Sequence, residues 1–583
     1  MFTRVLIANR GEIAVRIIRT LREMGLTSIA AFSEADRDAL FVLQADEAYA
    51  LGPSAPSESY LNSEAILSVA RRAKAQAIHP GYGFLAENAE FAASVAEAGL
   101  TFIGPTPDAI RLMGDKVRAR QTVAATGVPI VPGTMEPLRD LDQAVDFGSQ
   151  RGYPLVIKAA GGGGGRGIRR IDGPSGLAEA LESARREARS HFKNPEVYLE
   201  RYFPDSHHVE IQVLADSHGH LVHLGERDCS IQRRHQKLIE ETPSPVLDAS
   251  LRQLMGEMAL RAASSASYLS AGTVEFLVTP QREFYFLEMN TRIQVEHPIT
   301  EEVTGVDLIR EMVLAARGDH LTVRESAQDL RGHAIEVRVN AEDPAAGFRP
   351  TPVRLTRYRE PGGIGIRMDS GVYQGYAIPE HYDSLMAKLI AWAPDREAAR
   401  RRALRALGEY EIVGPANTLA FAAAVLEHAV FVQGEAGTSF VADYFDQLQA
   451  QIHDPRSWEV DTGDSHRKGP ERIFEVEVNR RLFRVRVSEL ATDLHPTPNS
   501  KRPRSVKPRQ RVSGGALVSP MHGTIISITK QPGEPIKEGE TLFIIEAMKM
   551  ENEIPSQRTG IIISLDVQVG DTVDADQRLA IVE

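Results

Sequence analysis

Polar side chains recur at every second position of the segment FYFLEMNTRIQVE, which begins at residue 284. They are Glu288, Asn290, Arg292, Gln294 and Glu296. In an extended chain, side chains at this spacing face the same way, and the apolar side chains between them face the opposite way. The sequence therefore predicts a strand with one face suited to binding a metal and phosphate. An ordinary amphipathic strand with solvated charges is the alternative.

A second strand, predicted at residues 273–278 (TVEFLV), is joined to this segment by a turn at residues 280–283. A hairpin centred on that turn places Glu275 opposite Glu288. Two facing carboxylates repel each other, and a bound cation removes the repulsion. Because oxygen ligands suit Mg²⁺ that bridges nucleotide phosphates, this pair indicates a metal–nucleotide site.

Five consecutive glycines, residues 161–165, follow an apolar strand predicted at residues 153–160. Glycines allow a backbone to approach phosphates closely and to move as a lid. The run is not a Walker A loop, because no Gly-Lys-Ser/Thr follows it. Lys158 adds a cation just before the glycines. The pattern favours a phosphate-binding lid over a flexible surface loop.

A short run of cations occurs in the segment ERDCSIQRRHQK, residues 226–237. A run of this kind is usually a solvated face, but the neighbouring carboxylate strand makes ATP an attractive ligand for it. Cys229 lies inside the run. We expect a small buried residue here and not a nucleophile, because the sequence shows no activating arrangement.

A duplication near the C-terminus isolates one lysine. Residues 523–546 and 560–583 align without a gap at an offset of 37. Each half is rich in β-branched residues and glycine turns, so each predicts short strands, and the halves are expected to pack as a quasi-twofold pair. The piece between them opens with AMKMEN, whose lysine is Lys549. The alternative to a protruding attachment point is an exposed hairpin lysine between two core methionines.

Residues 519–583 resemble the biotinyl domain of biotin-dependent carboxylases, in which biotin is carried on the lysine of a Met-Lys-Met turn. The related lipoyl domains share the duplicated fold, but their turn usually carries Asp-Lys-Ala. The resemblance implies covalent biotin on Lys549. His522 is a departure, because the family more often has proline there.

Composition narrows the class of protein. A chain of 583 residues suggests about four domains. The net charge of −12 argues against a general nucleic-acid partner, and no apolar run is long enough for a membrane span. The single cysteine cannot form an intrachain disulfide, which favours a reducing compartment. A strand predicted at residues 5–8 leaves no room for a signal peptide, so we expect a cytoplasmic protein.

Strand and helix alternate in the N-terminal region, with strands predicted at residues 5–8, 28–32 and 77–78, which is the rhythm of a parallel sheet. Residues 472–487 predict a β-hairpin. Residues 495–515 are rich in proline and basic residues and have no apolar pattern, so they indicate a flexible tether, with a nucleic-acid patch as the alternative.

Residues 1–446 resemble the biotin carboxylase component, an ATP-grasp enzyme. The matching motifs are IANRGEIA (7–14), HPGYGFL (79–85), the glycine run, residues 226–237, residues 288–298 and YDSL (382–385). The resemblance implies an α/β fold. It comprises a parallel-sheet N-terminal domain, a lid and a mixed α+β C-terminal part, followed by the small all-β biotinyl domain. The expected divisions are 1–114, 115–330 with a lid at about 131–203, 331–446, 447–494, 495–515 and 516–583.

The same resemblance assigns roles residue by residue. ATP contacts are implied for Lys116, Lys158, Gly161, Gly162, Gly163, Gly164, Gly165, Glu200, His208, Gln232 and His235. Mg²⁺ (or Mn²⁺) ligands are implied for Glu275, Glu288 and Asn290. Lys237, Arg292, Gln294 and Val295 would position bicarbonate, Glu296 would be its general base, Arg338 would stabilise the biotin enolate, and Tyr82 and Gly83 would lie near the ureido ring. Arg201 and residues 414–417 depart from the family pattern.

These roles imply ATP-dependent carboxylation, by bicarbonate, of biotin on Lys549. The layout resembles the α subunit of acetyl- or propionyl-CoA carboxylases, a ligase component of fatty acid metabolism. It implies transfer of the carboxyl group to an acyl-CoA by a separate carboxyltransferase β subunit. We also expect biotin protein ligase as a partner and an oligomeric state. The alternatives are another ATP-grasp ligase that carries a biotinyl-like module, and a non-catalytic biotin carrier.

Overall fold

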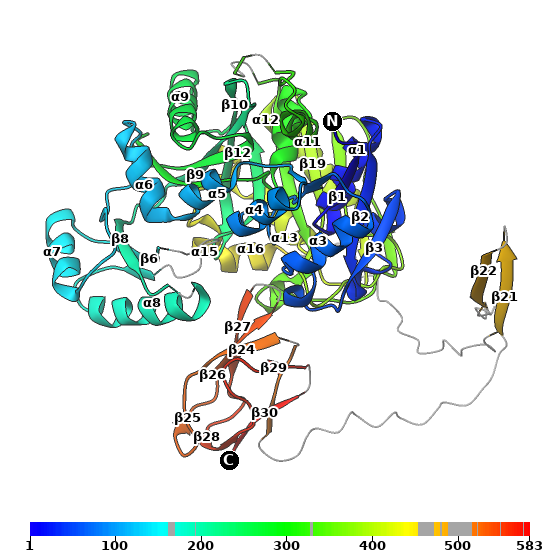
Figure 1. The fold of residues 1–583 in the computed structure, drawn as a ribbon. Helices are drawn as coiled ribbons and strands as arrows, with labels where there is room; N and C mark the ends of the chain where they lie inside the picture. The colour runs from blue at the N-terminus through cyan, green and yellow to red at the C-terminus, as the bar shows by residue number, and fades with distance from the viewer. Residues whose placement is uncertain are drawn as a thin grey trace.

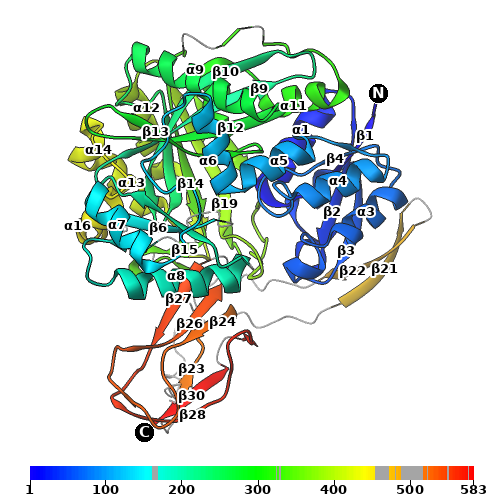
Figure 2. The same ribbon diagram turned by 60° about the vertical axis from the view of Figure 1, so that its left-hand side comes forward.

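The computed structural model describes most of the chain, and Figures 1 and 2 show it from two directions. The described residues are 1–160, 169–192, 194–323, 325–326, 330–452, 472–478, 481–487, 516–521, 523–547, 550–574 and 577–583. No helix among them combines the length and the apolar character needed to cross a lipid bilayer.

A five-stranded parallel sheet forms the N-terminal part, drawn in blue in Figure 1. Its strand order is β3-β2-β1-β4-β5, and its strands are β1 (Arg4–Ile7), β2 (Thr27–Ser33), β3 (Glu47–Gly52), β4 (Ala77–His79) and β5 (Thr101–Phe102). The helices around it are α1 (Gly11–Glu23), α2 (Leu40–Gln44), α3 (Ser63–Arg72) and α4 (Ala89–Glu97). Strand β1 pairs in parallel with β2 and β4, so the βαβ prediction for this region is confirmed. Val5, Leu6 and Ile7 are fully buried.

The centre of the molecule is an eight-stranded sheet of order β13-β12-β9-β10-β11-β14-β19-β18. Its strands are β9 (His207–Ala215), β10 (Leu221–Arg233), β11 (Gln236–Thr242), β12 (Ser270–Val278), β13 (Phe284–Asn290), β14 (His333–Asn340), β18 (Ile366–Ser370) and β19 (Leu385–Ala393). Helices α9 (Ala249–Ser265), α10 (His297–Thr304), α11 (Leu308–Arg317) and α12 (Arg396–Glu409) pack around it. All neighbours in it are antiparallel, in contrast to the N-terminal sheet.

A small sheet of order β7-β6-β8 lies apart from the central sheet and carries the predicted lid region. It is built from β6 (Leu155–Ala159), β7 (Arg169–Ile171) and β8 (Val197–Arg201), with α7 (Leu141–Arg151) and α8 (Leu177–Phe192) beside it. Helices α5 (Pro107–Gly114) and α6 (Lys116–Ala125) lead into it. Asp115 caps α6 by accepting from two backbone N–H groups, which fixes the helix start and therefore the position of Lys116.

The remaining α-helices and strands up to residue 452 are short. They are α13 (Leu419–Glu427), α14 (Ala429–Gln433), α15 (Phe440–Asp443), α16 (Phe445–Gln451), the pair β15 (Glu342–Asp343) and β16 (Arg349–Pro350), and the pair β17 (Arg357–Arg359) and β20 (Glu411–Val413). Strands β21 (Arg472–Val478) and β22 (Arg481–Val487) pair antiparallel, so the hairpin prediction is confirmed. The predicted tether, residues 495–515, lies outside the described residues.

Two four-stranded sheets, drawn in orange and red in Figure 1, form the C-terminal β unit, with orders β23-β30-β28-β25 and β27-β26-β24-β29. Its strands are β23 (Ala516–Val518), β24 (Gly523–Ile528), β25 (Pro535–Ile536), β26 (Thr541–Ala547), β27 (Met550–Pro555), β28 (Gly560–Leu565), β29 (Thr572–Val573) and β30 (Arg578–Val582). Strands β24, β25 and β26 recur as β28, β29 and β30, so the predicted duplication is confirmed. Lys549, between β26 and β27, lies outside the described residues.

Candidate functional site

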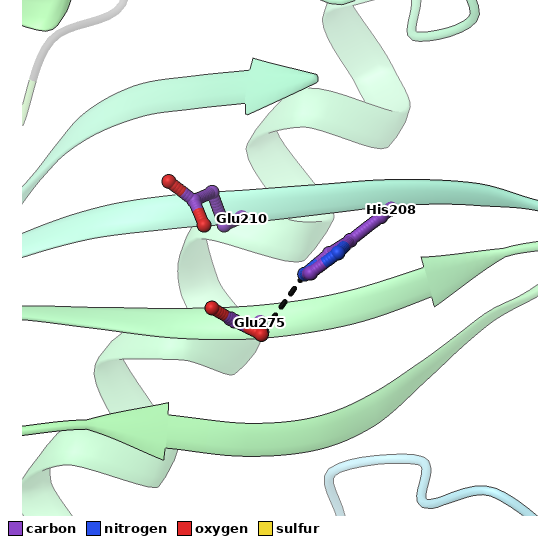
Figure 3. Close-up of side chains that lie close together, drawn as sticks. All are labelled: His208, Glu210 and Glu275. Atoms are coloured by element: carbon purple, nitrogen blue, oxygen red, sulfur yellow. Dashed lines mark hydrogen bonds and ion pairs between the residues drawn. The ribbon is translucent and has the colours of Figure 1, made fainter. Parts of the chain in front are cut away.

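One face of the central sheet carries the candidate site. On β9, His208 and Glu210 alternate with the buried Val209 and Ile211, which pack against α9, and Glu275 of β12 lies opposite Glu210 across the strand pair. The Nε2 atom of His208 lies 2.9 Å from an oxygen of Glu275. Figure 3 draws this contact as a dashed line. Strand periodicity thus places ionisable groups on one face and the apolar core on the other.

Lys237, near the start of β11, joins three carboxylates. Its Nζ lies 2.6 Å from Glu210, 3.3 Å from Glu275 and 2.5 Å from Glu296. Burial lowers the pKa of this ammonium group. The surrounding carboxylates raise it by more, so the net pKa is well above its ordinary value. Lys237 is therefore a permanent cation at the centre of the site.

Glu296 is completely buried and lies directly before α10. It pairs with Lys237 and, at 3.0 Å, with Arg338 of β14, whose Nε donates to Glu240 at 2.6 Å. Burial raises the pKa of Glu296, but Lys237, Arg338 and Arg227 lower it more, so the net pKa lies well below the ordinary value. The carboxylate is held ionised between two cations.

The strand predicted to run to Glu296 is shorter than expected. It ends at Asn290, and the chain then turns before α10 begins, so the prediction of one extended polar face was wrong beyond that residue. The turn folds the polar groups back toward each other: Gln294 donates to Glu275 at 3.1 Å, and Arg292 donates to Asn290 at 3.2 Å. Convergence is therefore achieved by a compact turn and not by strand alternation.

The predicted facing carboxylates are confirmed, because Glu275 and Glu288 are register partners on β12 and β13. Each has its own partners: Glu288 pairs with Lys116 at 2.8 Å, while Lys237 and His208 contact Glu275 and the Asn290 amide donates to it at 2.7 Å. Burial raises the pKa of Glu275, yet Lys237 and His208 lower it more, to well below its usual range. These oxygen donors fit a hard cation such as Mg²⁺, which would supply the same positive charge.

Lys116, Lys158 and Glu200, three of the residues expected to hold ATP, lie near one another. Lys158 of β6 pairs with Glu200 of β8 at 2.5 Å, and the fully buried Arg120 also contacts Glu200. Burial raises the pKa of Glu200, but Lys158 and Arg120 lower it below its ordinary value. Lys116 is close enough to contribute to that lowering. Two lysines and a carboxylate thus lie together where the sequence predicts a nucleotide.

Gln232 and His235 lie at the tight connection between β10 and β11. Gln232 is buried opposite Lys237, and His235 has a left-handed backbone with φ +65°. Burial lowers the pKa of His235, and Lys158 lowers it further, so the imidazole is neutral at pH 7. The predicted glycine run, residues 161–165, lies outside the described residues.

Residues implied for biotin and bicarbonate converge from other parts of the chain. The Tyr82 hydroxyl donates to Glu12, and Gly83 beside it has φ +66°, a conformation that favours glycine. Arg292 pairs with Glu87 at 2.9 Å, so its guanidinium bridges the N-terminal part and the turn after β13. The backbone carbonyl of Val295 accepts a hydrogen bond of 2.8 Å from a lysine of β19.

The sequence reasoning missed Glu210 and Arg227. Both are completely buried, and Arg227 Nε donates to Glu210 at 2.6 Å while Glu210 also holds Lys237. The period-two continuation from His208 could have identified Glu210. Cys229 is buried as expected, and burial raises the pKa of its thiol well above the ordinary value, which favours the protonated thiol.

Comparison with known proteins places this arrangement in a family. Residues 1–110 match the biotin carboxylase N-terminal domain, 115–324 the ATP-binding domain of the carbamoyl-phosphate synthase L chain, 336–443 the biotin carboxylase C-terminal domain, and 515–582 the biotin-requiring enzyme domain. Biotin carboxylase 1 of Bacillus subtilis is 51% identical over 445 residues, covering 76% of this chain and 99% of the relative. The chain belongs to the biotin carboxylases. Biotin, ATP and Mg²⁺ are the cofactors of this class of enzyme, and its reaction is the ATP-dependent carboxylation of biotin.

Two further relatives differ in the share of this chain that their similarity covers. A pyruvate carboxylase subunit of Methanothermobacter thermautotrophicus is 50% identical over 452 residues, covering 78% of this chain and 92% of the relative. The biotin-dependent acyl-coenzyme A carboxylase alpha3 subunit of Mycobacterium leprae is 41% identical over 589 residues, covering 99% of this chain and 98% of the relative. The second similarity therefore includes the C-terminal β unit.

Solved structures of biotin carboxylases share the fold. The Campylobacter jejuni biotin carboxylase in complex with β,γ-ATP has a TM-score of 0.74 and 44% identity, covering 76% of this chain and 99% of that one. The biotin carboxylase domain of Hydrogenobacter thermophilus 2-oxoglutarate carboxylase, with MgADP and bicarbonate, also has a TM-score of 0.74 and 44% identity, covering 77% and 99%. The predicted α/β ATP-grasp fold with a C-terminal all-β biotinyl domain is confirmed.

Proposed function

We propose that this enzyme is the α subunit of an acyl-CoA carboxylase of the acetyl- or propionyl-CoA type. It would carboxylate biotin on Lys549 with bicarbonate and ATP, and a separate carboxyltransferase β subunit would transfer the carboxyl group to an acyl-CoA. The observation that carries this proposal is the similarity to the Mycobacterium leprae alpha3 subunit, which extends over 99% of this chain and 98% of the relative.

A second candidate acceptor is pyruvate. The 50% identity to the pyruvate carboxylase subunit of Methanothermobacter thermautotrophicus supports it, but that similarity covers 78% of this chain. Identity within the carboxylase part reflects the reaction on biotin, which is common to both classes of enzyme. The acceptor is chosen by the carboxyltransferase, so similarity over the whole chain is the better guide to the partner.

Glu296 is the proposed general base that removes the bicarbonate proton as bicarbonate attacks the γ-phosphate of ATP. Lys237, Arg292, Gln294 and Val295 are proposed to position the anion. In the absence of substrate, the pKa of Glu296 is held low, first of all by Lys237. When Lys237 turns to bicarbonate, that pairing weakens, the pKa of Glu296 rises, and the carboxylate becomes a stronger base.

The ATP-binding residues are proposed to be Lys116, Lys158, the glycines of residues 161–165, Glu200, His208, Gln232 and His235. The facing oxygens of the register partners Glu275 and Glu288 support a metal site there, completed by Asn290. Mg²⁺ bound at these oxygens would supply charge that neutralises the transferring phosphoryl group. The Lys116 ammonium, which holds Glu288 in the structure, would then be released to a phosphate oxygen.

Arg338, Tyr82 and Gly83 are proposed to form the biotin side of the site. Biotin on Lys549 would supply the ureido nitrogen that accepts the carboxyl group. Arg338 already neutralises Glu240 and Glu296, and its guanidinium is proposed to stabilise negative charge that develops on an oxygen during transfer. The two carboxylates hold this guanidinium in place, so it needs little reorganisation when the acceptor arrives.

The proposed assembly also includes biotin protein ligase, which would modify Lys549, and an oligomeric state in the cytoplasm. The proposed domains are 1–114, 115–330, 331–446, 447–494, 495–515 and 516–583, with the lid at about 131–203. In this scheme the hairpin of β21 and β22 is a docking element for the β subunit, and a core or lid hairpin is the alternative.

The test is acceptor specificity in the assembled complex. The chain is co-expressed with its carboxyltransferase partner, and incorporation of radiolabelled bicarbonate into acetyl-CoA, propionyl-CoA, a longer acyl-CoA and pyruvate is compared. We expect ATP-dependent labelling of a short acyl-CoA and none of pyruvate. Labelling of pyruvate alone would assign the enzyme to the second candidate class.

A further inference from the structure

We infer that the buried ion pair of Glu12 and Lys388 is a positioning pair. It fixes the position of the biotin side of the active site relative to the bicarbonate side. The pair touches one residue of each side: Tyr82, proposed to lie near the ureido ring, and Val295, proposed to position bicarbonate. The inference therefore rests on those two proposed roles. It concerns residues that no part of the mechanism above uses.

The contacts form a continuous chain across the enzyme. The Tyr82 hydroxyl donates to one carboxylate oxygen of Glu12, and the other oxygen lies 3.1 Å from Lys388 Nζ. Lys388 Nζ in turn donates to the backbone carbonyl of Val295 at 2.8 Å. Glu12 is 2% exposed and Lys388 is fully buried, so water does not compete for these bonds.

The four residues come from four separate segments of the chain. Glu12 lies in the first turn of α1 and Tyr82 in the loop after β4, whereas Lys388 is in the middle of β19 and Val295 precedes α10. The segments of Glu12 and Tyr82 match the biotin carboxylase N-terminal domain, that of Lys388 the C-terminal domain, and that of Val295 the ATP-binding domain. A shift of the N-terminal part would therefore be transmitted to the turn that presents Glu296.

Neighbouring strands fix the direction of the Lys388 side chain. Lys388 is the register partner of Arg338 on β14 and of Asp369 on β18, so these side chains share the polar face. The two cations have different partners. Arg338 binds Glu240 and Glu296, while Lys388 binds Glu12 and the backbone carbonyl of Val295.

The backbone of Glu12 is also packed closely, against Gly371. A Cβ atom added at Gly371, just after β18, would lie 2.6 Å from the backbone nitrogen of Glu12, so only glycine allows this approach. The end of β18 is thus in close backbone contact with the start of α1. A displacement of Glu12 would therefore displace the end of β18 as well. A rigid connection of this kind suits positioning, because a misplacement of about 1 Å can cost about a hundredfold in rate.

The experiment compares three full-length variants: Glu12→Gln, Lys388→Met and the double variant. Each single change leaves one buried charge without its partner, which destabilises the fold, whereas the double change removes both charges together. Glu241→Gln is the matched control, because Glu241 is a buried carboxylate of the same sheet that pairs with Arg396 at 2.7 Å and His333 at 2.8 Å. All variants carry Lys549→Arg, so that free biotin is the only acceptor.

The readouts are melting temperature, the KM for bicarbonate, free biotin and ATP, and kcat. If the pair positions the site, the double variant recovers most of the melting temperature lost in the single variants. It nevertheless keeps a rise of about tenfold or more in the KM for bicarbonate and for biotin, with the KM for ATP nearly unchanged. The control loses melting temperature and keeps all three KM values.

Two results would overturn the inference, and they are distinguishable. A double variant with the parental KM for bicarbonate and biotin would show that the pair only stabilises the fold. A parental chain whose ATP hydrolysis responds to neither bicarbonate nor biotin would refute the proposed roles of Tyr82 and Val295, and the inference with them.

Discussion

Replacing Glu296 by glutamine should abolish most bicarbonate-dependent ATP hydrolysis while leaving the fold and ATP binding intact. The change keeps the size of the side chain and removes the carboxylate that we propose as general base. Glu296 is completely buried between Lys237 and Arg338, so the first question is whether those cations tolerate its loss.

The structure indicates that they do. Lys237 retains Glu210 at 2.6 Å and Glu275 at 3.3 Å, and Arg338 retains Glu240 at 2.6 Å. Neither cation is left unpaired, so the penalty of about 3–5 kcal/mol for breaking a buried ion pair should not be reached. Loss of a general base typically costs about 10²–10⁴-fold, which corresponds to about 3–5 kcal/mol in activation free energy. The effect on rate should therefore exceed the effect on stability.

The assay measures phosphate release with and without bicarbonate, together with ATP affinity by calorimetry and the melting temperature. Glu226→Gln is a suitable control, because Glu226 is also a buried carboxylate. Its partner is Arg252, at 2.7 Å, and not Lys237. We expect near-normal ATP affinity in both variants and loss of kcat only in Glu296→Gln. Turnover within about threefold of the parent in that variant would show that another group is the base.

Three further outcomes are expected. Lys549→Arg should abolish avidin binding, since the duplication leaves Lys549 as the one lysine at the turn, and a persistent avidin signal on a blot would contradict this. Deleting half of residues 495–515 should preserve carboxylation of free biotin but slow acyl-CoA carboxylation with the partner, and equal loss of both activities would mean that the segment is structural. Burial raises the pKa of Glu342 from 4.5 to about 7, so the folded state favours its protonated form, and stability is lost as the pH rises through about 7. Glu342→Gln should therefore increase the unfolding free energy by up to about 3 kcal/mol above pH 8 and by little near pH 5. The same change in melting temperature at both pH values would contradict the assignment.

Local patterns predicted several features of the fold correctly. The alternation of Glu275 and Glu288 with apolar neighbours, together with a short turn between the strands, was enough to place these carboxylates opposite each other. The offset of 37 residues likewise predicted the repeated strands of the C-terminal unit. Both succeed because register in a hairpin or a duplicated unit depends on residues close in sequence.

The prediction failed where the same pattern was extended too far. The period-two spacing continues to Glu296, but the strand stops at Asn290. Alternation shows which residues can share a face in an extended chain, and it does not show where the chain stops being extended. In this protein the turn is stabilised by distant partners, such as Glu275 for Gln294 and Glu87 for Arg292.

The sequence by itself determined the chemical class of this enzyme: its motifs, the order of its domains, and the lysine expected to carry biotin. Only the tertiary structure decided which charges meet. Glu210, Lys237 and Glu296 lie on or beside β9, β11 and α10, and Glu12 meets Lys388 from the opposite end of the carboxylase region. The physical reason is that the order of strands in a sheet, and the helices that cover it, follow from the packing of the whole apolar core. No window of sequence around a single charged residue contains that information.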